Sequence, residues 1–241
     1  MIQDIFTPQE LLERSVRTRK ALTWFVIIAI VMFFAGLTSA YVVSMSGGYW
    51  VDIGIPKPFL ISTVAIVLGS ICAQVALGAA GKGRTGIIAP MLVVTLLLGG
   101  VFTWSQFQGW KELVSKGNFL SGKVLDNKGT YGTDYTIRYK SVPLVFESGS
   151  FYHPDDAART KPLNADLDEQ KNNSSAFFYA LTAAHLAHLF FGLFSLLVMI
   201  VMALRGRYTQ QDHAGLWAGT IYWHFLGGLW IYLLLFLVFV H

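Results

Sequence analysis

The chain has 241 residues, of which 54% are hydrophobic and only 13% are charged, and its mean hydropathy is +0.52. Soluble domains carry about 25% charged residues, so this composition excludes a disordered chain and an ordinary soluble globule. The single cysteine, Cys72, excludes an internal disulfide and a multi-thiolate zinc site.

The N-terminal segment carries a helix-start signal. The motif Thr7-Pro8-Gln9-Glu10 has the pattern of a capping box, in which Thr7 caps the helix, Pro8 takes the first helical position and Glu10 reaches back. A short polar helix is therefore expected to lead into the first apolar run.

Five apolar runs follow along the chain. The predicted spans are residues 22–44, 59–80, 87–108, 176–203 and 216–239. Each has at least the ~20 residues that ~30 Å of hydrocarbon requires. All 14 Asp and Glu and all 18 Lys and Arg lie outside these spans. The sequence thus predicts an all-α transmembrane fold, a five-helix bundle.

The Lys and Arg residues of the short loops predict the orientation. They concentrate in the N-terminal segment and in the loops after the second and fourth spans, at Arg14, Arg17, Arg19, Lys20, Lys82, Arg84, Arg205 and Arg207. The loop after the first span has only Lys57. By the positive-inside rule the N-terminus is cytoplasmic, and His241 lies outside the cell's inner membrane. This topology signal also explains the net charge of +4, and no nucleic-acid partner is expected.

Residues 109–174 differ from the rest of the chain, because they hold nine basic and nine acidic residues. The turn signal of residues 126–129 is flanked by residues 123–125 and 135–139, which alternate like short strands. The segment is too long for a simple connector and is expected to form a small external lobe between the third and fourth spans. The predicted organisation is 1–108 (N-terminal helix and three spans), 109–174 (lobe) and 175–241 (two spans).

The absence of charge within the spans limits the function. Proton pumps, ion-coupled carriers and voltage sensors use ionisable groups at membrane depth. The remaining candidates are His185 and His188 in the fourth span and His224 in the fifth. They have three interpretations: haem ligation, a polar site for a lipid head group or a partner helix, and hydrogen bonds between helices, each worth ~0.6 kcal/mol.

Spacing bears on the haem interpretation. His185 and His188 share one helix face at i, i+3, so both cannot ligate one iron and His224 would supply the second ligand. Counted from the outer span ends at ~1.5 Å per residue, His188 lies ~18 Å deep and His224 ~24 Å deep, a mismatch of ~6 Å. On the residues alone all three interpretations stay open.

Other polar and aromatic residues of the spans receive structural interpretations. Gln74 and Gln106 are predicted to be buried amides. Four tryptophans at or near span ends are predicted to be interfacial anchors. They are Trp104, Trp110, Trp217 and Trp223.

Four of the spans carry recognisable motifs. The fourth, through Thr182-Ala183-Ala184-His185-Leu186-Ala187-His188, resembles a T-G-x-H-x-x-H helix, and the fifth, with Tyr222-Trp223-His224-Phe225, resembles Y-W-H-F-x-D-x-x-W. The first has Phe33-Phe34-Ala35-Gly36, similar to F-F-x-G, and the third runs from Leu98-Gly99 to Gln106, similar to L-L-G-x-x-F…Q. The resemblance covers all five spans in chain order, and it is to subunit III of cytochrome c oxidase and related haem-copper oxidases, in the five-helix form that lacks the first two of seven helices.

The chain departs from the family pattern at three carboxylates. Ile30 stands where the family usually has a glutamate before F-F-x-G, Gly227 replaces the aspartate of the fifth span, and Trp217 replaces a glutamate before it. Roles of those acids in lipid or proton contacts are therefore not expected here.

The resemblance implies a non-catalytic membrane subunit of a proton-pumping cytochrome c oxidase, the terminal oxidase of aerobic respiration. Such a subunit stabilises the catalytic subunit and holds structural lipids. No catalytic, cofactor or metal residue is expected in this chain; haem and copper belong to partner subunits. The side chains expected to contact lipid or neighbouring helices are His185, His188, Trp223 and His224.

The implied partners are the catalytic subunit I of a haem-copper oxidase, other oxidase subunits, phospholipid and a larger respiratory supercomplex. One alternative is a b-type haem-binding membrane anchor that uses His185 or His188 with His224. Another is a helper or assembly protein with no enzyme attached.

Overall fold

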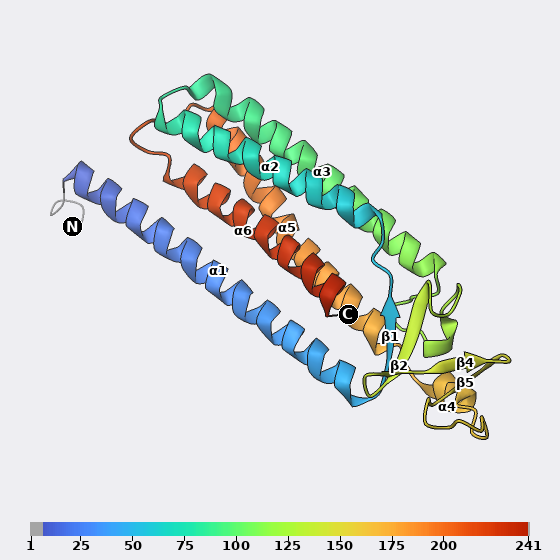
Figure 1. Ribbon diagram of the computed structural model, residues 1–241. Coiled ribbons are helices and arrows are strands. Elements are labelled where there is room, and N and C mark those ends of the chain that lie inside the picture. Colours follow the sequence, from blue (N-terminus) through green and yellow to red (C-terminus); the bar gives the residue numbers. More distant parts are fainter. Residues whose placement is uncertain (1–6, 241) are drawn as a thin grey trace. The chain divides into compact units, whose positions relative to one another are not determined.

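The structure is a computed structural model that describes residues 7–240 (Figure 1). Its long helices are α1 (Pro8–Gly47), α2 (Pro58–Gly81), α3 (Thr85–Ser115), α5 (Asn173–Leu204) and α6 (Ala214–Phe239). All five are long and apolar enough to cross a membrane, which confirms the predicted fold class. His241, expected on the outer side, lies outside the described residues.

The capping box at the start of α1 is confirmed. The backbone N–H of Thr7 donates to Glu10 Oε2 at 2.8 Å, and the Glu10 N–H donates to Thr7 Oγ1 at 3.3 Å. The predicted polar helix that leads into the first span is confirmed as the first part of α1, which continues unbroken from Pro8 to Gly47. No proline follows Pro8 in this stretch, so nothing interrupts the helix between its polar and apolar parts.

The chain contains two compact units. The first unit comprises Met1–Phe33, Leu60–Trp104 and His185–Ile231. In it α2 and α3 run antiparallel, joined by a tight turn at residues 82–84 (Figure 1). Thr95 of α3 donates its hydroxyl to the Gly69 carbonyl of α2 at 3.3 Å, so the two helices are tied within the apolar region.

Trp223 of α6 is the centre of packing in the first unit. A side chain added at Gly99 of α3 would place its Cβ 2.8 Å from Trp223 Cη2, and the corresponding distances are 3.4 Å from Gly69 to Nε1 and 3.5 Å from Gly192 to Cε3. Three helices thus approach the indole through glycines. Trp223 is 1% exposed, so its predicted role as an interfacial anchor is wrong.

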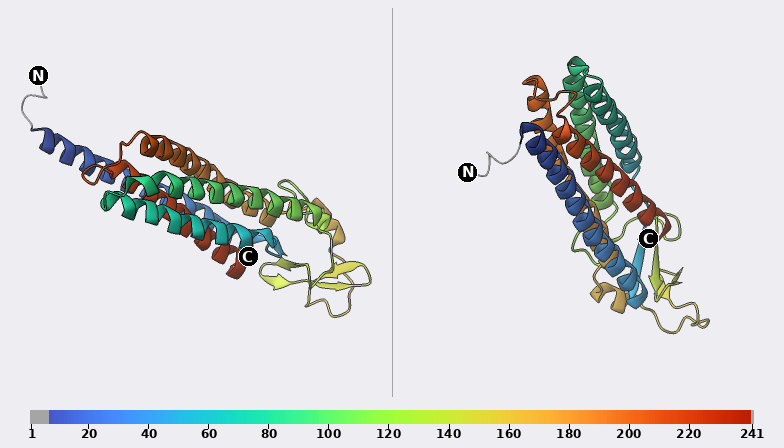
Figure 2. Two further views of the ribbon diagram at one scale, coloured as in Figure 1. Left: turned by 90° about the horizontal axis from the view of Figure 1, so that it is seen from above. Right: turned by 90° about the vertical axis from the view of Figure 1, so that its left-hand side faces the viewer.

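The second unit comprises Phe34–Phe59, Ser105–Ala184 and Tyr232–His241. It contains an antiparallel sheet in the order β1 (Tyr49–Ile53), β2 (Tyr135–Tyr139) and β3 (Val142–Pro143), and a hairpin of β4 (Val145–Glu147) and β5 (Ser150–Tyr152). The strands β2 to β5 are the yellow-green segments of Figure 2, left. A 3-10 turn, η1 (Val124–Asp126), and a short helix, α4 (Asn164–Glu169), complete the unit.

The strand β1 comes from the linker between α1 and α2, far along the chain from β2. Val51 pairs with Ile137, and both are fully buried. Asp52, which pairs with Thr136, and Arg138, which pairs with Trp50, form an ion pair diagonally across the two strands. The sequence did not predict this strand, since the linker is short.

The strand prediction is confirmed for residues 135–139 and wrong for residues 123–125. Instead of a strand, Val124–Asp126 forms η1, closed by the Lys123 N–H that donates to Asp126 Oδ2 at 2.7 Å. An aspartate whose side chain bonds its own neighbouring backbone favours such a turn over a ladder. Helix α3 also extends to Ser115, beyond the predicted span end at residue 108.

Candidate functional site

His185 lies on α5 in the first unit and is fully buried. Its Nε2 is 3.0 Å from the carbonyl oxygen of Leu226 on α6, so the imidazole N–H donates to that carbonyl. The rings of Phe102 and Trp230 lie 5.6 Å and 5.3 Å away, centroid to centroid. His185 therefore joins α5 to α6 inside an aromatic layer.

His188 lies one turn along α5 and is half-buried. Its backbone carbonyl accepts a hydrogen bond from the Tyr222 hydroxyl at 3.1 Å. Its ring lies 6.0 Å from that of Phe33 on α1. Tyr222 and His188 therefore form a second polar contact between α5 and α6.

His224 points to a different helix. Its Nε2 lies 3.0 Å from Oε1 of Gln74 on α2. The prediction that Gln74 is a buried amide is wrong, because this side chain is exposed; Gln106 is buried, as predicted. His224 and Gln74 therefore form a polar contact on the surface of the unit, between two otherwise apolar helices.

The four predicted site residues thus divide between the interior and the surface. His185 and Trp223 are enclosed by neighbouring helices, while His188 and His224 are partly accessible. The Nε2 of His185 bonds to a residue of α6, whereas the Nε2 of His224 bonds to a residue of α2. Among residues 7–240 no three His, Cys, Asp or Glu side chains gather as a metal site would require.

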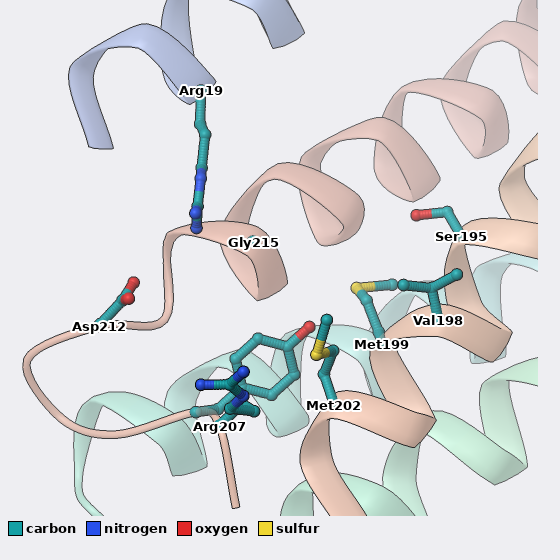
Figure 3. Close-up of a pocket in the computed structure, with 9 residues that line it drawn as sticks. Arg19, Ser195, Val198, Met199, Met202, Arg207, Asp212 and Gly215 are labelled. Atoms are coloured by element: carbon teal, nitrogen blue, oxygen red, sulfur yellow. The ribbon is translucent and has the colours of Figure 1, made fainter. Parts of the chain in front are cut away.

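A cavity of about 470 Å³ lies where α1 passes the loop between α5 and α6 (Figure 3). Arg19 extends into it from α1, and Arg207 and Asp212 come from the loop. The inner wall is apolar and consists mainly of α5 side chains. Its residues include Val198, Met199 and Met202.

The phenol of Tyr208 completes the polar part of this cavity. Tyr208 is 8% exposed, and burial raises its pKa above the ordinary value. Its hydroxyl therefore stays protonated and is available to donate. The cavity thus combines two guanidinium groups and a neutral hydroxyl donor with an apolar wall, and Asp212 supplies its one carboxylate.

In the sequence, Arg19 and Arg207 are topology signals, and no local pattern marks them as a site. They lie far apart in the chain, and only the fold shows that they share a cavity. The available signal was their place: basic residues directly beside a membrane span are suited to lipid phosphates. Nearby, the Lys20 ammonium lies 5.2 Å from the ring centroid of Trp217, a cation–π contact that adds positive charge to this region.

Comparison with known proteins gives consistent matches. No family model matches the chain. It is similar to cytochrome c oxidase subunit 3 of Corynebacterium diphtheriae, at 22% identity over 217 residues, which is 87% of this chain and 82% of the relative. The protein of that name from Synechocystis sp. is 34% identical over 94 residues, 39% of this chain and 37% of the relative. The one from Thermostichus vulcanus is 40% identical over 57 residues, 23% and 28% of the two chains.

Proposed function

Because the chain is a homologue of cytochrome c oxidase subunit 3, we propose that it is a non-catalytic membrane subunit of a proton-pumping cytochrome c oxidase. In this role it stabilises the catalytic subunit and holds structural phospholipid. Haem and copper reside in partner subunits, among them subunit I, and the complex joins a larger respiratory assembly. The N-terminus is cytoplasmic and the C-terminus lies outside.

The cavity at the α5–α6 loop is the observation that carries the lipid-holding role. Arg19 and Arg207 line its polar part, and methionine side chains line its inner wall. Guanidinium groups bind phosphate oxygens with charge-assisted hydrogen bonds, and the apolar wall suits the acyl chains below a head group. The proposed ligand is a phospholipid whose phosphate lies between the two arginines and the Tyr208 hydroxyl.

Asp212 refines the choice of head group. Its carboxylate lines the same cavity and would repel a phosphate that came close. An ammonium-bearing head group satisfies both signs, since its phosphate faces the arginines and its amine faces Asp212. A zwitterionic phospholipid with a primary amine, phosphatidylethanolamine, therefore fits the lining.

The lipid test uses the assembled complex purified in mild detergent. The Arg19→Gln and Arg207→Gln double variant should retain about ten-fold less phosphatidylethanolamine per complex, because two charge-assisted contacts are worth at least ~1.4 kcal/mol together. Arg84→Gln, in the exposed loop between α2 and α3, is the matched control. Unchanged lipid content in the double variant, measured by mass spectrometry, would reject the cavity as a lipid site.

The histidine contacts support this role over the haem-anchor alternative. The Nε2 of His185 bonds to a backbone carbonyl, and the Nε2 of His224 bonds to Gln74. Ligation of one iron through the Nε2 of His224, with His185 or His188 as the second ligand, would require the bond to Gln74 to break, and ligation through the Nε2 of His185 would break the bond to Leu226. We therefore assign the histidines to contacts between helices or with lipid.

Co-purification tests the membership of the complex. A tagged chain extracted in mild detergent should bring with it a haem-containing catalytic subunit, whereas a helper or assembly protein would be free of it at steady state. Replacement of His224 by Phe should leave the haem content per catalytic subunit unchanged. A stoichiometric loss of haem absorbance, with all other subunits still present, would establish the haem anchor instead.

A further inference from the structure

A groove of about 470 Å³ runs between α2 and α6 on the surface of the first unit. Val67, Ile71 and Val75 of α2 form one wall, and Ile231 of α6 contributes to the other. Gln74 and His224 lie within it and are hydrogen-bonded to each other. The groove therefore has apolar walls and one polar point.

The polar pair has hydrogen-bonding capacity left over. Because the His224 Nε2–H donates to Gln74 Oε1, the Nδ1 of His224 is an acceptor and the Gln74 amide keeps two donors. Within residues 7–240 neither side chain has another hydrogen-bond partner. An unmade hydrogen bond away from water costs free energy, so the groove calls for an occupant with both a donor and an acceptor.

The depth of the pair excludes most lipid groups. From Ala214 to His224 the α6 rise is ~15 Å, about half the thickness of the hydrocarbon layer. Acyl chains are present at that depth, and they neither donate nor accept hydrogen bonds. Phosphate and amine head groups lie at the edge of the layer. A protein side chain is the group that brings hydrogen-bonding atoms to the middle of the membrane.

The floor of the groove suits a helix. Gly227, Gly228 and Ser70 line it, and a Cβ built on Gly228 meets nothing within 4 Å. Small residues let the backbones of two membrane helices come close together. The large residues on the walls are exposed, Ile71 by 56% and Val75 by 47%, which leaves them free to pack against an incoming helix.

We propose that this α2–α6 groove is the docking surface for a transmembrane helix of the neighbouring oxidase subunit. This inference rests on the proposed membership of an oxidase complex. The docking helix presents a serine or threonine hydroxyl at the middle of the membrane. That hydroxyl donates to His224 Nδ1 and accepts from the Gln74 amide, while small and β-branched residues beside it fill the floor.

The principal test fills the floor without disturbing the fold. Gly228→Leu should reduce the co-purified haem-containing subunit by about ten-fold, the effect of a side chain forced into a packed interface. Gly100→Leu is the matched control, because Gly100 is an exposed helix glycine of α3 with nothing within 4 Å of an added Cβ. This control should leave co-purification at the wild-type level.

A second variant tests the hydrogen bonds themselves. Gln74→Leu keeps the size of the side chain and removes the amide. Association should weaken by about three-fold, the scale of one interhelical hydrogen bond in a membrane. Unchanged association in both Gly228→Leu and Gln74→Leu would overturn the proposal.

Photo-crosslinking identifies the occupant even if the leucine variants accumulate poorly. Benzoylphenylalanine placed at Ile71, in the groove, should crosslink to the haem-containing subunit. The same group at Leu97, which is 65% exposed on α3, should not. Crosslinks at Ile71 to lipid alone, or to a second copy of this chain, would overturn the docking surface. Failure of the wild-type chain to co-purify with any haem-containing subunit would instead reject the proposed function.

Discussion

At the scale of single residues, three glycines decide how closely the helices around Trp223 approach one another. Each of them faces the indole from a different helix. Because glycine has no side chain, the backbone of each helix can come close to the ring. Dense packing of this kind is what holds membrane helices together, since lipid is as apolar as the side chains it replaces. The indole contacts are therefore a main source of stability in the first unit.

The first prediction concerns Gly99. An alanine Cβ there would lie 2.5 Å from Leu193 Cδ2 and 2.8 Å from Trp223 Cη2, so Gly99→Ala should destabilise the chain by about 1–3 kcal/mol through overpacking. The measurement is thermal unfolding of the purified protein in detergent. Gly100→Ala, its neighbour with open space, should have no such effect and should be slightly stabilising, because alanine favours a helix. Equal melting temperatures for the two variants would contradict the packing argument.

The same residues show what sequence leaves undetermined in a membrane chain. Length and lack of charge are sufficient to locate all five helices. They do not tell which face is buried, because a side that meets lipid and a side that meets protein are both apolar. Trp223 and Gln74 were therefore assigned to the wrong environments, one buried instead of interfacial and the other exposed instead of buried.

At the scale of elements, the β2–β3 hairpin has an unusual turn. Its two loop residues, Lys140 and Ser141, have φ angles of 47° and 70°, which a two-residue turn of this kind requires and which favour Asn-Gly. Neither residue is a turn signal in sequence. The Asp-Asn-Lys-Gly signal upstream begins at the last residue of η1, Asp126, and closes no hairpin.

The second prediction follows from that turn. Ser141→Gly removes the cost of a left-handed conformation, ~1–2 kcal/mol for a residue with a side chain. Glycine also gives the unfolded chain more conformational entropy, which lowers the stability by ~0.4–1 kcal/mol. A net stabilisation of about 1 kcal/mol is therefore expected. The temperature at which the lobe loses resistance to thermolysin should rise. Ser150→Gly, in strand β5, should lower it, because glycine weakens a strand. A lower protease resistance in Ser141→Gly would show that the turn is not strained.

The loop after β5 is organised by one carboxylate. The backbone N–H of Lys161 donates to Asp156 Oδ2 at 2.8 Å, and the Thr160 hydroxyl donates to Oδ1 at 3.2 Å. The Lys161 N–H, above all, holds the pKa of Asp156 below its usual value. The stabilising effect is therefore fully present above the ordinary aspartate pKa of about 3.9 and is lost as the pH falls through the lower folded-state pKa.

The third prediction imitates that protonation at neutral pH. Asp156→Asn should increase trypsin cleavage at the Arg159–Thr160 bond by several-fold, because a neutral acceptor binds the loop N–H more weakly. The cleavage site is identified by mass spectrometry of the fragments. Asp155→Asn, which alters the neighbouring carboxylate that is 90% exposed, serves as the control and should cleave at the wild-type rate. Equal cleavage of all three proteins would exclude an organising role for Asp156.

At the scale of the whole molecule, the loops and helix ends define a topology. Lys82 and Arg84 follow α2, and Arg205 and Arg207 follow α5. The lobe residues follow α3, on the other side if each long helix crosses the membrane once. By the positive-inside rule, the arrangement of basic residues predicts that the first side is cytoplasmic.

The fourth prediction tests this orientation. In a Cys72→Ser background, Lys128→Cys in the lobe should react with a membrane-impermeant thiol reagent added outside intact cells. Lys82→Cys, in the exposed α2–α3 loop, should react only after the cells are opened. The reverse pattern would invert the topology while leaving the five helices in place.

Sequence located the lobe by its length and charge but did not locate its main strand pairing. The strand β1 lies between two spans, where a short linker was expected, and its partner β2 lies beyond α3. Such pairing depends on two segments far apart in the chain, and no local pattern encodes it. The cavity with Arg19 and Arg207 escaped prediction for the same reason.

The pairing of β1 with β2 also sets an order of events during synthesis. Strand β1 is made before α2 and α3, but its partners, from Tyr139 opposite Tyr49 to Tyr135 opposite Ile53, follow both helices. At 5–20 residues per second the wait is on the order of ten seconds. During that interval the linker between α1 and α2 presents an open strand edge, which other chains can pair with. A ribosome that stalls after α3 therefore leaves three helices and a strand β1 whose backbone lacks the partner that β2 provides in the complete sheet.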